Sequence, residues 1–179
     1  TNLVNSISLI SPEEMWLATN GGAIEIDMSR DLLHEMPHLA PINTSNSELP
    51  SDRVRTVFRD NAQRYWFGTD KGVVVSASGD TSPFQNLDIY TTQDHPALPS
   101  NVVNSIVEDD LGYIWIATAR GATRVPPDSV AAPESWQLFD EQSGLRGTQV
   151  LHILRSERGD LWFSTDSGLS VIDFTDDPQ

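Results

Sequence analysis

The sequence repeats one short signature four times: a tryptophan, a threonine three positions later, and a glycine three positions after the threonine. The four tryptophans are 50, 49 and 47 residues apart in a chain of 179 residues. A period of this size is typical of proteins that repeat one supersecondary unit. The repeat residues are Trp16, Trp66, Trp115 and Trp162; Thr19, Thr69, Thr118 and Thr165; and Gly22, Gly72, Gly121 and Gly168.

Each copy has the pattern of a set of short β-strands. A run rich in valine, isoleucine and phenylalanine precedes each tryptophan and ends in polar turn residues, as in a strand that leads into a hairpin. A second strand carries the tryptophan, and a third follows the glycine, which we expect at a turn with positive φ. A weaker fourth strand fits residues 87–91 and 136–140, and nothing comparable is clear in the first copy.

The second strand is apolar on both of its faces. The tryptophan and a small residue two positions later, such as Trp115 and Ala117, share one face, and large residues such as Ile114 and Ile116 share the other. A sheet with two apolar faces has to be covered on both. Small residues of one sheet opposite large residues of the next would let the sheets nest, which predicts a β-propeller.

We therefore expect an all-β fold, a β-propeller segment of four blades with three to four antiparallel strands each. The repeat tryptophans should be buried between blades, whereas Trp136, outside the repeat register, should lie on an outer strand where its loss costs clearly less stability. The predicted blades are 1–48 with a loop insertion at 28–47, 49–97, 98–144, and 145–179, which is incomplete.

The segment is expected to belong to a larger propeller of about seven blades. Its open blade faces should carry large apolar residues, such as those that flank Trp16 and Trp162. Because large apolar faces are unfavourable in water, self-association of two copies is expected.

The composition excludes several kinds of site and partner. The chain has no cysteine, so it has no disulfide and no thiolate metal site. It has 26 acidic and 11 basic residues and a net charge of −15, which disfavours binding to nucleic acid or anionic lipid. No apolar run approaches the roughly 20 residues of a membrane helix, so we expect no direct membrane insertion.

The third copy, residues 98–121, reads LPSNVVNSIVEDDLGYIWIATARG. This unit closely resembles the two-component regulator propeller repeat, and the resemblance covers nearly all of the chain except residues 28–47 and the last six. It implies a periplasmic sensor region of a bacterial inner-membrane receptor. Such regions feed a histidine kinase, a hybrid two-component system or a diguanylate cyclase, and none of these output modules stands in this sequence.

Three motifs have functional interpretations that the sequence does not favour. Residues 34–38 spell the HExxH string of zinc proteases, but Pro37 would break the helix that this site needs. Residues 110–115 have the D-x-G-x-x-W form of the Asp box of sialidases, a structural turn whose carboxylate bonds backbone amides. Residues 158–160 read RGD, but they stand where the repeat places a hairpin turn.

Propellers bind small ligands where loops of several blades meet at one mouth of the central channel. The loops before each first strand and between each second and third strand should open on that face. Because the hairpin tips differ most between the copies, they are where a function can be added. The candidate ligand-binding residues are Asn20, Arg53, Asp70, Lys71, Asn101, Arg120, Gln149 and Asp166.

The sequence suggests no catalytic residue, metal ligand or cofactor. The expected partners are a carbohydrate or another small extracellular ligand, and the rest of the same receptor. Two alternatives stay open. A propeller lyase or hydrolase would bring ionisable groups together at the channel mouth, and a pure dimerisation scaffold would show no ligand-induced change in melting temperature.

Overall fold

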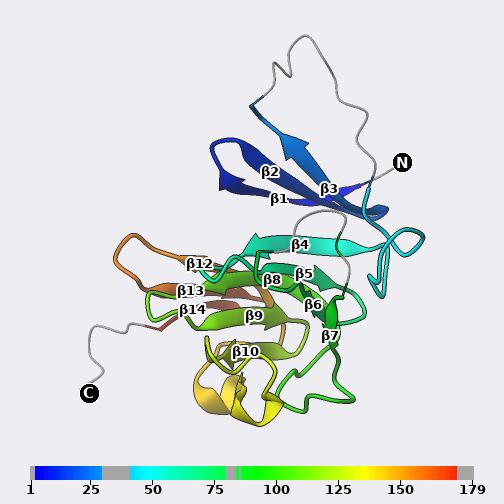
Figure 1. Cartoon of the computed structure of the whole chain (residues 1–179). Helices are drawn as coiled ribbons and strands as arrows, with labels where there is room; N and C mark the ends of the chain where they lie inside the picture. The colour runs from blue at the N-terminus through cyan, green and yellow to red at the C-terminus, as the bar shows by residue number, and fades with distance from the viewer. Residues whose placement is uncertain (1–2, 30–40, 80–83, 85, 173–179) are drawn as a thin grey trace. The chain divides into compact units, whose positions relative to one another are not determined.

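The computed structural model describes residues 3–29, 41–79, 84 and 86–172, and strands are the main regular secondary structure of this part (Figure 1). The chain divides into two compact units, Thr1–Ile89 and Tyr90–Gln179. The four antiparallel sheets are blades 1 to 4 in chain order.

The first unit contains blade 1, with the strand order β1-β2-β3, and blade 2, with the order β4-β5-β6-β7. In place of a fourth strand in blade 1, Ile42 forms an isolated bridge with Ala23 of the third strand. The strands are β1 (Val4–Ser11), β2 (Glu14–Thr19), β3 (Gly22–Asp27), β4 (Val54–Arg59), β5 (Tyr65–Thr69), β6 (Val73–Val75) and β7 (Asp88–Tyr90).

The second unit contains blade 3, with the order β11-β10-β9-β8, and blade 4, with the order β12-β13-β14. The elements are β8 (Val103–Glu108), β9 (Ile114–Thr118), β10 (Gly121–Val125), η1 (Pro133–Ser135), β11 (Gln137–Phe139), η2 (Glu141–Ser143), β12 (Val150–Arg155), β13 (Leu161–Thr165) and β14 (Gly168–Ile172). The predicted all-β fold is therefore confirmed, and the two expected fourth strands are β7 and β11.

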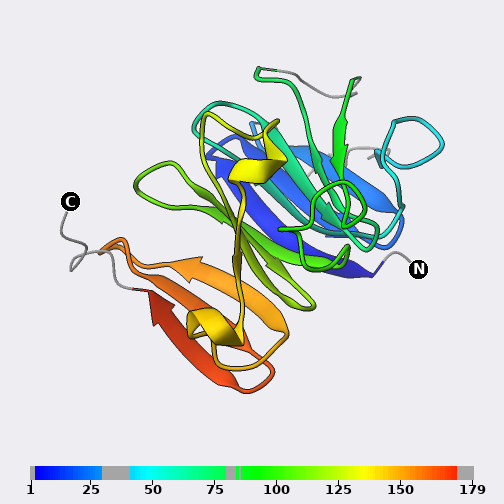
Figure 2. The ribbon, with the colours of Figure 1, turned by 90° about the horizontal axis from the view of Figure 1, so that it is seen from below.

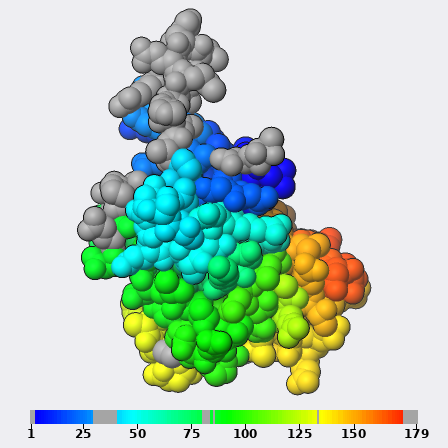
Figure 3. Space-filling view, turned by 90° about the vertical axis from the view of Figure 1, so that its right-hand side faces the viewer, coloured from blue at the N-terminus to red at the C-terminus, as the bar shows by residue number. Residues whose placement is uncertain are grey.

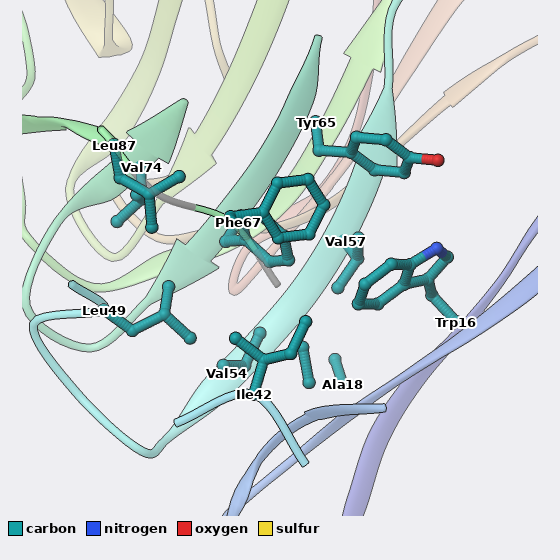
Figure 4. Close-up of a cluster of buried hydrophobic side chains, with 12 residues drawn as sticks. Trp16, Ala18, Ile42, Leu49, Val54, Val57, Tyr65, Phe67, Val74 and Leu87 are labelled. Atoms are coloured by element: carbon teal, nitrogen blue, oxygen red, sulfur yellow. The ribbon is translucent and has the colours of Figure 1, made fainter. Parts of the chain in front are cut away.

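Trp16 joins the two sheets of the first unit. Its side chain is buried, and its ring centroid lies 5.6 Å from that of Tyr65 and 5.8 Å from that of Phe67. Ala18, two positions after Trp16, belongs to the same buried cluster (Figure 4). The predicted nesting of a tryptophan and a small residue against two large residues is confirmed for blades 1 and 2.

The second unit repeats this arrangement with Trp115. Trp115 and Ala117 of blade 3 share a buried cluster with Leu161 and Phe163 of blade 4. The rings of Trp115 and Phe163 meet edge-on, with centroids 5.5 Å apart, a geometry that aromatic pairs prefer. In both units, a tryptophan and an alanine of one blade therefore pack against two large side chains of the next blade.

An asparagine lies at one end of each of these interfaces. Asn5, the second residue of β1, donates from Nδ2 to the carbonyl oxygen of Val54 at 2.7 Å. Asn104 occupies the same place in β8 and donates to the carbonyl oxygen of Val150 at the same distance. Because Val54 and Val150 begin the next blade, each asparagine ties two blades together. We call this contact the asparagine clasp.

An arginine lies at the other end of each interface. Arg59, the last residue of β4, is 3.3 Å from the Glu14 carboxylate, and Arg155, the last residue of β12, is 2.6 Å from Asp110. Glu14 also accepts a hydrogen bond from the Tyr65 hydroxyl. Burial, together with this bond, raises the pKa of Tyr65. Each interface thus has a polar contact at both ends and a tryptophan between them.

Trp162 departs from the prediction. Its side chain is 41% exposed, while the other three repeat tryptophans are at most 1% exposed. The expectation that every repeat tryptophan is buried is therefore wrong for blade 4. Leu161 and Phe163, expected on an open face, are instead fully buried and share a cluster with blade 3 residues. Because side chains alternate along a strand, Trp162 lies on the opposite face of the sheet.

Trp136 is buried although it lies outside the repeat register. Its indole donates to the carbonyl oxygen of Val130 at 3.2 Å, and its ring stacks on His95 with centroids 5.3 Å apart. Tyr90 completes this cluster, 4.7 Å from His95. This burial removes the reason to expect that loss of Trp136 costs clearly less than loss of a repeat tryptophan.

Replacing Trp115 by alanine should lower the free energy of unfolding by about 3–5 kcal/mol, because the change leaves a cavity between blades 3 and 4. Trp162→Ala should cost less than about 2 kcal/mol, because a large part of that side chain is already in water. Urea denaturation of both variants measures the difference. Equal losses would contradict the packing described for Trp115.

His95 should make the stability of the second unit depend on pH. Burial lowers its pKa from the ordinary value of 6.5, and the negative charge of Asp94 opposes this shift to a smaller extent. The Nδ1 atom is buried with no hydrogen-bond partner among the described residues. The unfolded chain therefore takes up a proton more readily than the folded chain, so stability is lost as the pH falls through 6.5.

The variant His95→Phe should flatten this loss in a plot of the urea unfolding midpoint against pH between about 7 and 5. His152→Phe is the matched control, because His152 is exposed and lies outside the cluster of Tyr90, His95 and Trp136. A slope that persists without His95 would contradict the assignment.

Candidate functional site

The repeat threonine shapes the hairpin that joins the second and third strands. In all four blades its hydroxyl donates to the carbonyl oxygen of the repeat glycine at 2.8–3.0 Å and accepts a hydrogen bond from the amide two residues on. The four glycines have φ between 115° and 133°, so the predicted positive φ is confirmed. A Cβ on Gly121 would also lie 2.7 Å from the Phe139 carbonyl oxygen, so this glycine lets β11 approach.

The hairpin tips lie on the same side of their blade as the loop before the first strand. In three blades an amide of the tip donates to the carbonyl oxygen that directly precedes the first strand, at 3.0–3.1 Å. The pairs are Asn20 to Leu3, Ala119 to Val102, and Asp166 to Gln149. Within each of blades 1, 3 and 4, the two loops therefore lie at the same end of the sheet, as predicted.

A cleft of about 450 Å³ opens beside one of these tips in the second unit. Arg120 comes from the β9–β10 hairpin, the acidic residues come from η2 and its N-terminal cap, and Thr148 precedes β12. Figure 2 shows η2, in gold, beside the orange to red strands of blade 4. A volume of this size suits a small ligand. The lining residues are Ala119, Arg120, Asp140, Glu141, Gln142 and Thr148.

The η2 wall of the cleft is held by its own caps. Asp140 accepts hydrogen bonds from the amides of Gln142 at 2.9 Å and Ser143 at 3.2 Å, and Gly144 ends the turn with a φ of 98°. The Asp140 carboxylate is thus engaged in the turn, and Glu141 is exposed. We did not predict this wall, although an aspartate N-cap and a glycine C-cap are the usual signals of a short helix.

Arg120 is the one basic residue among those that line the cleft. Its backbone amide donates to Thr118 at 3.2 Å, which positions the side chain at the hairpin tip. The side chain is exposed and makes no hydrogen bond or ion pair within the described residues. Its guanidinium therefore offers a planar set of donors to a ligand.

Two more predicted residues lie next to this cleft. Asp166 accepts hydrogen bonds from the Thr148 hydroxyl at 3.4 Å and from the Gln149 amide at 3.3 Å. Arg120 and Thr148 line the cleft, and Gln149 and Asp166 lie next to Thr148. The structure therefore brings three predicted residues, Arg120, Gln149 and Asp166, to the cleft or its border. Asn101 instead accepts a hydrogen bond from the Thr92 amide at 2.8 Å and is not among the lining residues.

In the first unit, two of the predicted residues interact with other residues of the chain, Asn20 through a hydrogen bond and Asp70 through its charge. Asn20 accepts a hydrogen bond at 3.0 Å from Asn5, which also forms the clasp to blade 2. One carboxylate oxygen of Asp70 is buried without a hydrogen-bond partner among the described residues. Burial lowers the pKa of Arg55, and the charge of Asp70 opposes that shift.

The other two candidates of the first unit, Arg53 and Lys71, are exposed. Hydrogen bonds from Thr44 lower the pKa of Asp52, and the charge of Lys71 adds a smaller effect in the same direction. Lys71 therefore lies near enough to Asp52 to attract it, and this attraction is a local contact of the loop surface.

The Asp-box motif forms a structural turn, but a different carboxylate holds it. Asp109 accepts from the amides of Leu111 and Tyr113 and from the Trp115 indole, at 2.8–3.0 Å. Asp110, the first residue of the D-x-G-x-x-W string, bonds Arg155 instead. The carboxylate assigned from the motif was therefore one residue too late, and the turn anchors the tryptophan of its own blade.

Of the other two motifs, the structure describes only the RGD string. Residues 158–160 lie in the β12–β13 hairpin, where the Gly159 amide donates to Ser156 at 3.1 Å, as their position predicted. The HExxH string lies outside the described residues. Within the part of the chain that the structure describes, no three histidine or acidic side chains group closely enough to hold a metal ion. The same part contains no helix that is long and apolar enough to cross a membrane.

Residues 48–71 and 97–120 match the family described as Two component regulator propeller. The chain contains two component regulator propeller repeats. Both matches span the first strand, the tryptophan and the hairpin threonine of one blade, which are the features that organise the fold described above. No curated protein sequence matches the chain significantly.

Solved structures place these repeats in a β-propeller. The extracellular domain of a hybrid two component system from B. thetaiotaomicron is 26% identical with a TM-score of 0.77, over 95% of this chain and 21% of that chain. A second extracellular domain from B. thetaiotaomicron, of a one component system, is 15% identical with a TM-score of 0.50, over 94% and 27%. The chain thus spans about a fifth to a quarter of these relatives.

Streptogramin B lyase has a similar fold, with a TM-score of 0.60 and 13% identity over 94% of this chain and 53% of that chain. At this identity the likeness shows the fold alone. The described segment is therefore a partial β-propeller of four blades of the kind found in extracellular domains of two component systems.

Proposed function

We propose that the chain is a non-catalytic, ligand-sensing segment of an extracytoplasmic receptor, and that the cleft beside Arg120 binds the ligand. The family repeats and the 26% identity to an extracellular domain support the receptor context. In this proposal a periplasmic ligand is bound here, and the signal passes to an output module elsewhere in the receptor.

The composition of the cleft carries the proposal. Arg120 supplies donors that have no partner among the described residues, the exposed Glu141 supplies acceptors, and Thr148 supplies a hydroxyl that can do both. The neighbouring acidic groups disfavour a strongly anionic ligand, because like charges within a few ångströms repel. A mixture of donors and acceptors around a small volume suits a neutral, hydroxyl-rich molecule, so we assign a mono- or oligosaccharide as the ligand class.

The proposal does not include catalysis. A hydrolase or lyase needs a positioned acid and base with a reacting atom between them. Of the two carboxylates that line this cleft, Asp140 is engaged by the amides of Gln142 and Ser143. The likeness to streptogramin B lyase concerns the fold and does not favour an enzymatic role.

Isothermal titration calorimetry with a panel of neutral and acidic mono- and oligosaccharides tests this function. At least one neutral sugar should bind, and Arg120→Ala should weaken its binding at least about tenfold because a charged donor is lost. Arg158→Ala is the matched control, since Arg158 is also exposed but lies in the β12–β13 hairpin. Absence of binding by every sugar, or equal weakening in both variants, would contradict the proposal.

A further inference from the structure

Two blades close the gap between the loop before their first strand and the connection from the preceding blade. In blade 2, Asp52 stands two residues before β4 and accepts a hydrogen bond from the Thr44 amide at 2.9 Å. In blade 3, Asn101 stands two residues before β8 and accepts one from the Thr92 amide at 2.8 Å. We call this contact the loop bond, because it ties the two loops together beside the first strand.

The donor of the loop bond has a counterpart in the connection between blades 3 and 4. Thr44 follows Ile42 by two residues, and Ile42 bridges to Ala23, the residue after the repeat glycine of blade 1. Glu141 likewise follows Phe139 by two residues, and Phe139 pairs with the alanine after the repeat glycine of blade 3. Glu141 therefore takes the place that Thr44 has in the loop bond of blade 2.

Blade 4 does not form the loop bond. Thr148 stands two residues before β12, in the place of Asp52 and Asn101. Its hydroxyl donates to Asp166 at 3.4 Å, and within the described residues no hydrogen bond joins it to Glu141. Thr148 and Glu141 both line the cleft. The space that the loop bond closes in blades 2 and 3 is thus open in blade 4 and forms part of the cleft.

A glycine brings the loop of blade 4 against its own hairpin. Gly147 stands where blades 2 and 3 have Ser51 and Ser100, whose hydroxyls accept hydrogen bonds from amides two residues later at 3.1 Å. Gly147 has a φ of 86°, and a Cβ on it would overlap a carboxylate oxygen of Asp166. The same oxygen accepts from the Gln149 amide at 3.3 Å. Blade 4 therefore replaces a local turn bond by contacts with Asp166, which hold the loop that carries Thr148.

The two walls of the opened space offer opposite hydrogen-bonding groups. The Thr148 hydroxyl is the donor in its bond to Asp166, because a carboxylate only accepts. Its oxygen therefore offers lone pairs to the cleft, while Arg120 offers N–H donors. A sugar hydroxyl donates and accepts, so it can bond either group. Figure 3 shows the yellow to orange segment that contains η2 and the start of β12 at the molecular surface, where a ligand can reach it.

We propose that Thr148 opens this cleft to a neutral saccharide and that Asp166 is the positioning residue that holds Thr148 in place. The inference rests on the proposed function of the cleft and adds the residues that make the cleft accessible. The saccharide lies between Thr148 and η2, in the space that the loop bond closes in blades 2 and 3. The side chain two residues before the first strand thus determines whether a blade has a closed loop pair or a binding cleft.

Amide hydrogen exchange, measured by NMR on the whole chain without ligand, tests the opening. Thr148→Asn supplies the side-chain oxygen that Asn101 uses in blade 3, so exchange of the Glu141 amide should become at least about tenfold slower. Asn101→Thr is the reciprocal variant, and exchange of the Thr92 amide should become at least about tenfold faster because its acceptor is lost. An unchanged exchange rate at either amide would overturn the assignment of the loop bond.

Isothermal titration calorimetry with glucose, galactose, mannose and cellobiose tests the consequence for binding. Thr148→Asn should weaken the binding of each sugar that binds the original chain at least about tenfold, because the loop bond closes the cleft, whereas Thr148→Ser keeps the hydroxyl and should stay within about threefold. Asp166→Ala should also weaken binding, and Asp166→Asn, which keeps an acceptor for Thr148, should restore it.

Two results of the titrations would overturn the proposal: undiminished binding by the Thr148→Asn chain, or equal losses in Asp166→Ala and Asp166→Asn. An original chain that binds none of the sugars would instead contradict the proposed function and, with it, the saccharide assigned here. The exchange rates of the Glu141 and Thr92 amides would still show separately whether the residue at position 148 opens the loops.

Discussion

The insertion of a tryptophan from one blade between two large side chains of the next holds each unit together. Trp16 and Trp115 show this contact in separate units, with aromatic neighbours at 5.5–5.8 Å. The rest of the repeat serves to present that ring. Asp109 binds the Trp115 indole at 2.8 Å and caps the turn before it, while Thr118 and Gly121 close the hairpin after it. The residues of the repeat signature therefore form one packing contact between blades and the turns before and after the strand that carries it.

Much of the fold could be predicted because the residues that form the turns around each tryptophan strand are close to it in sequence. The strands, the hairpin turns and the positive φ of the repeat glycines follow from alternation and spacing within one copy. The exposure of Trp162 and the burial of Trp136 did not follow, because burial depends on which surface lies opposite. Asp109 and Asp110 are adjacent and equally suited to a turn, so only the structure separates their roles. Asn5 and Asn104 were missed because their bonds cross from one blade to the next.

The candidate site was predicted in part. Arg120, Gln149 and Asp166 were identified because they occupy loops on one side of a repeating blade, and the structure brings them toward one cleft. The η2 wall lies in the connection between the fourth strand of blade 3 and Leu145, and the matching connection of blade 2, residues 91–97, differs from it in length and sequence. The repeat pattern alone therefore did not predict this wall. The repeated residues thus form the strands and turns of each blade, and residues that differ between the copies line the cleft.

A double-mutant cycle between Trp115 and Phe163 tests most directly whether the tryptophan contact joins the blades. The free energies of unfolding of Trp115→Ala, Phe163→Ala and the double variant are compared with that of the original chain by urea denaturation. If the two rings stabilise each other across the interface, the coupling energy should be about 0.5–1.5 kcal/mol, as for other aromatic pairs. Strictly additive losses would mean that the two side chains stabilise their own blades independently, and would contradict the account.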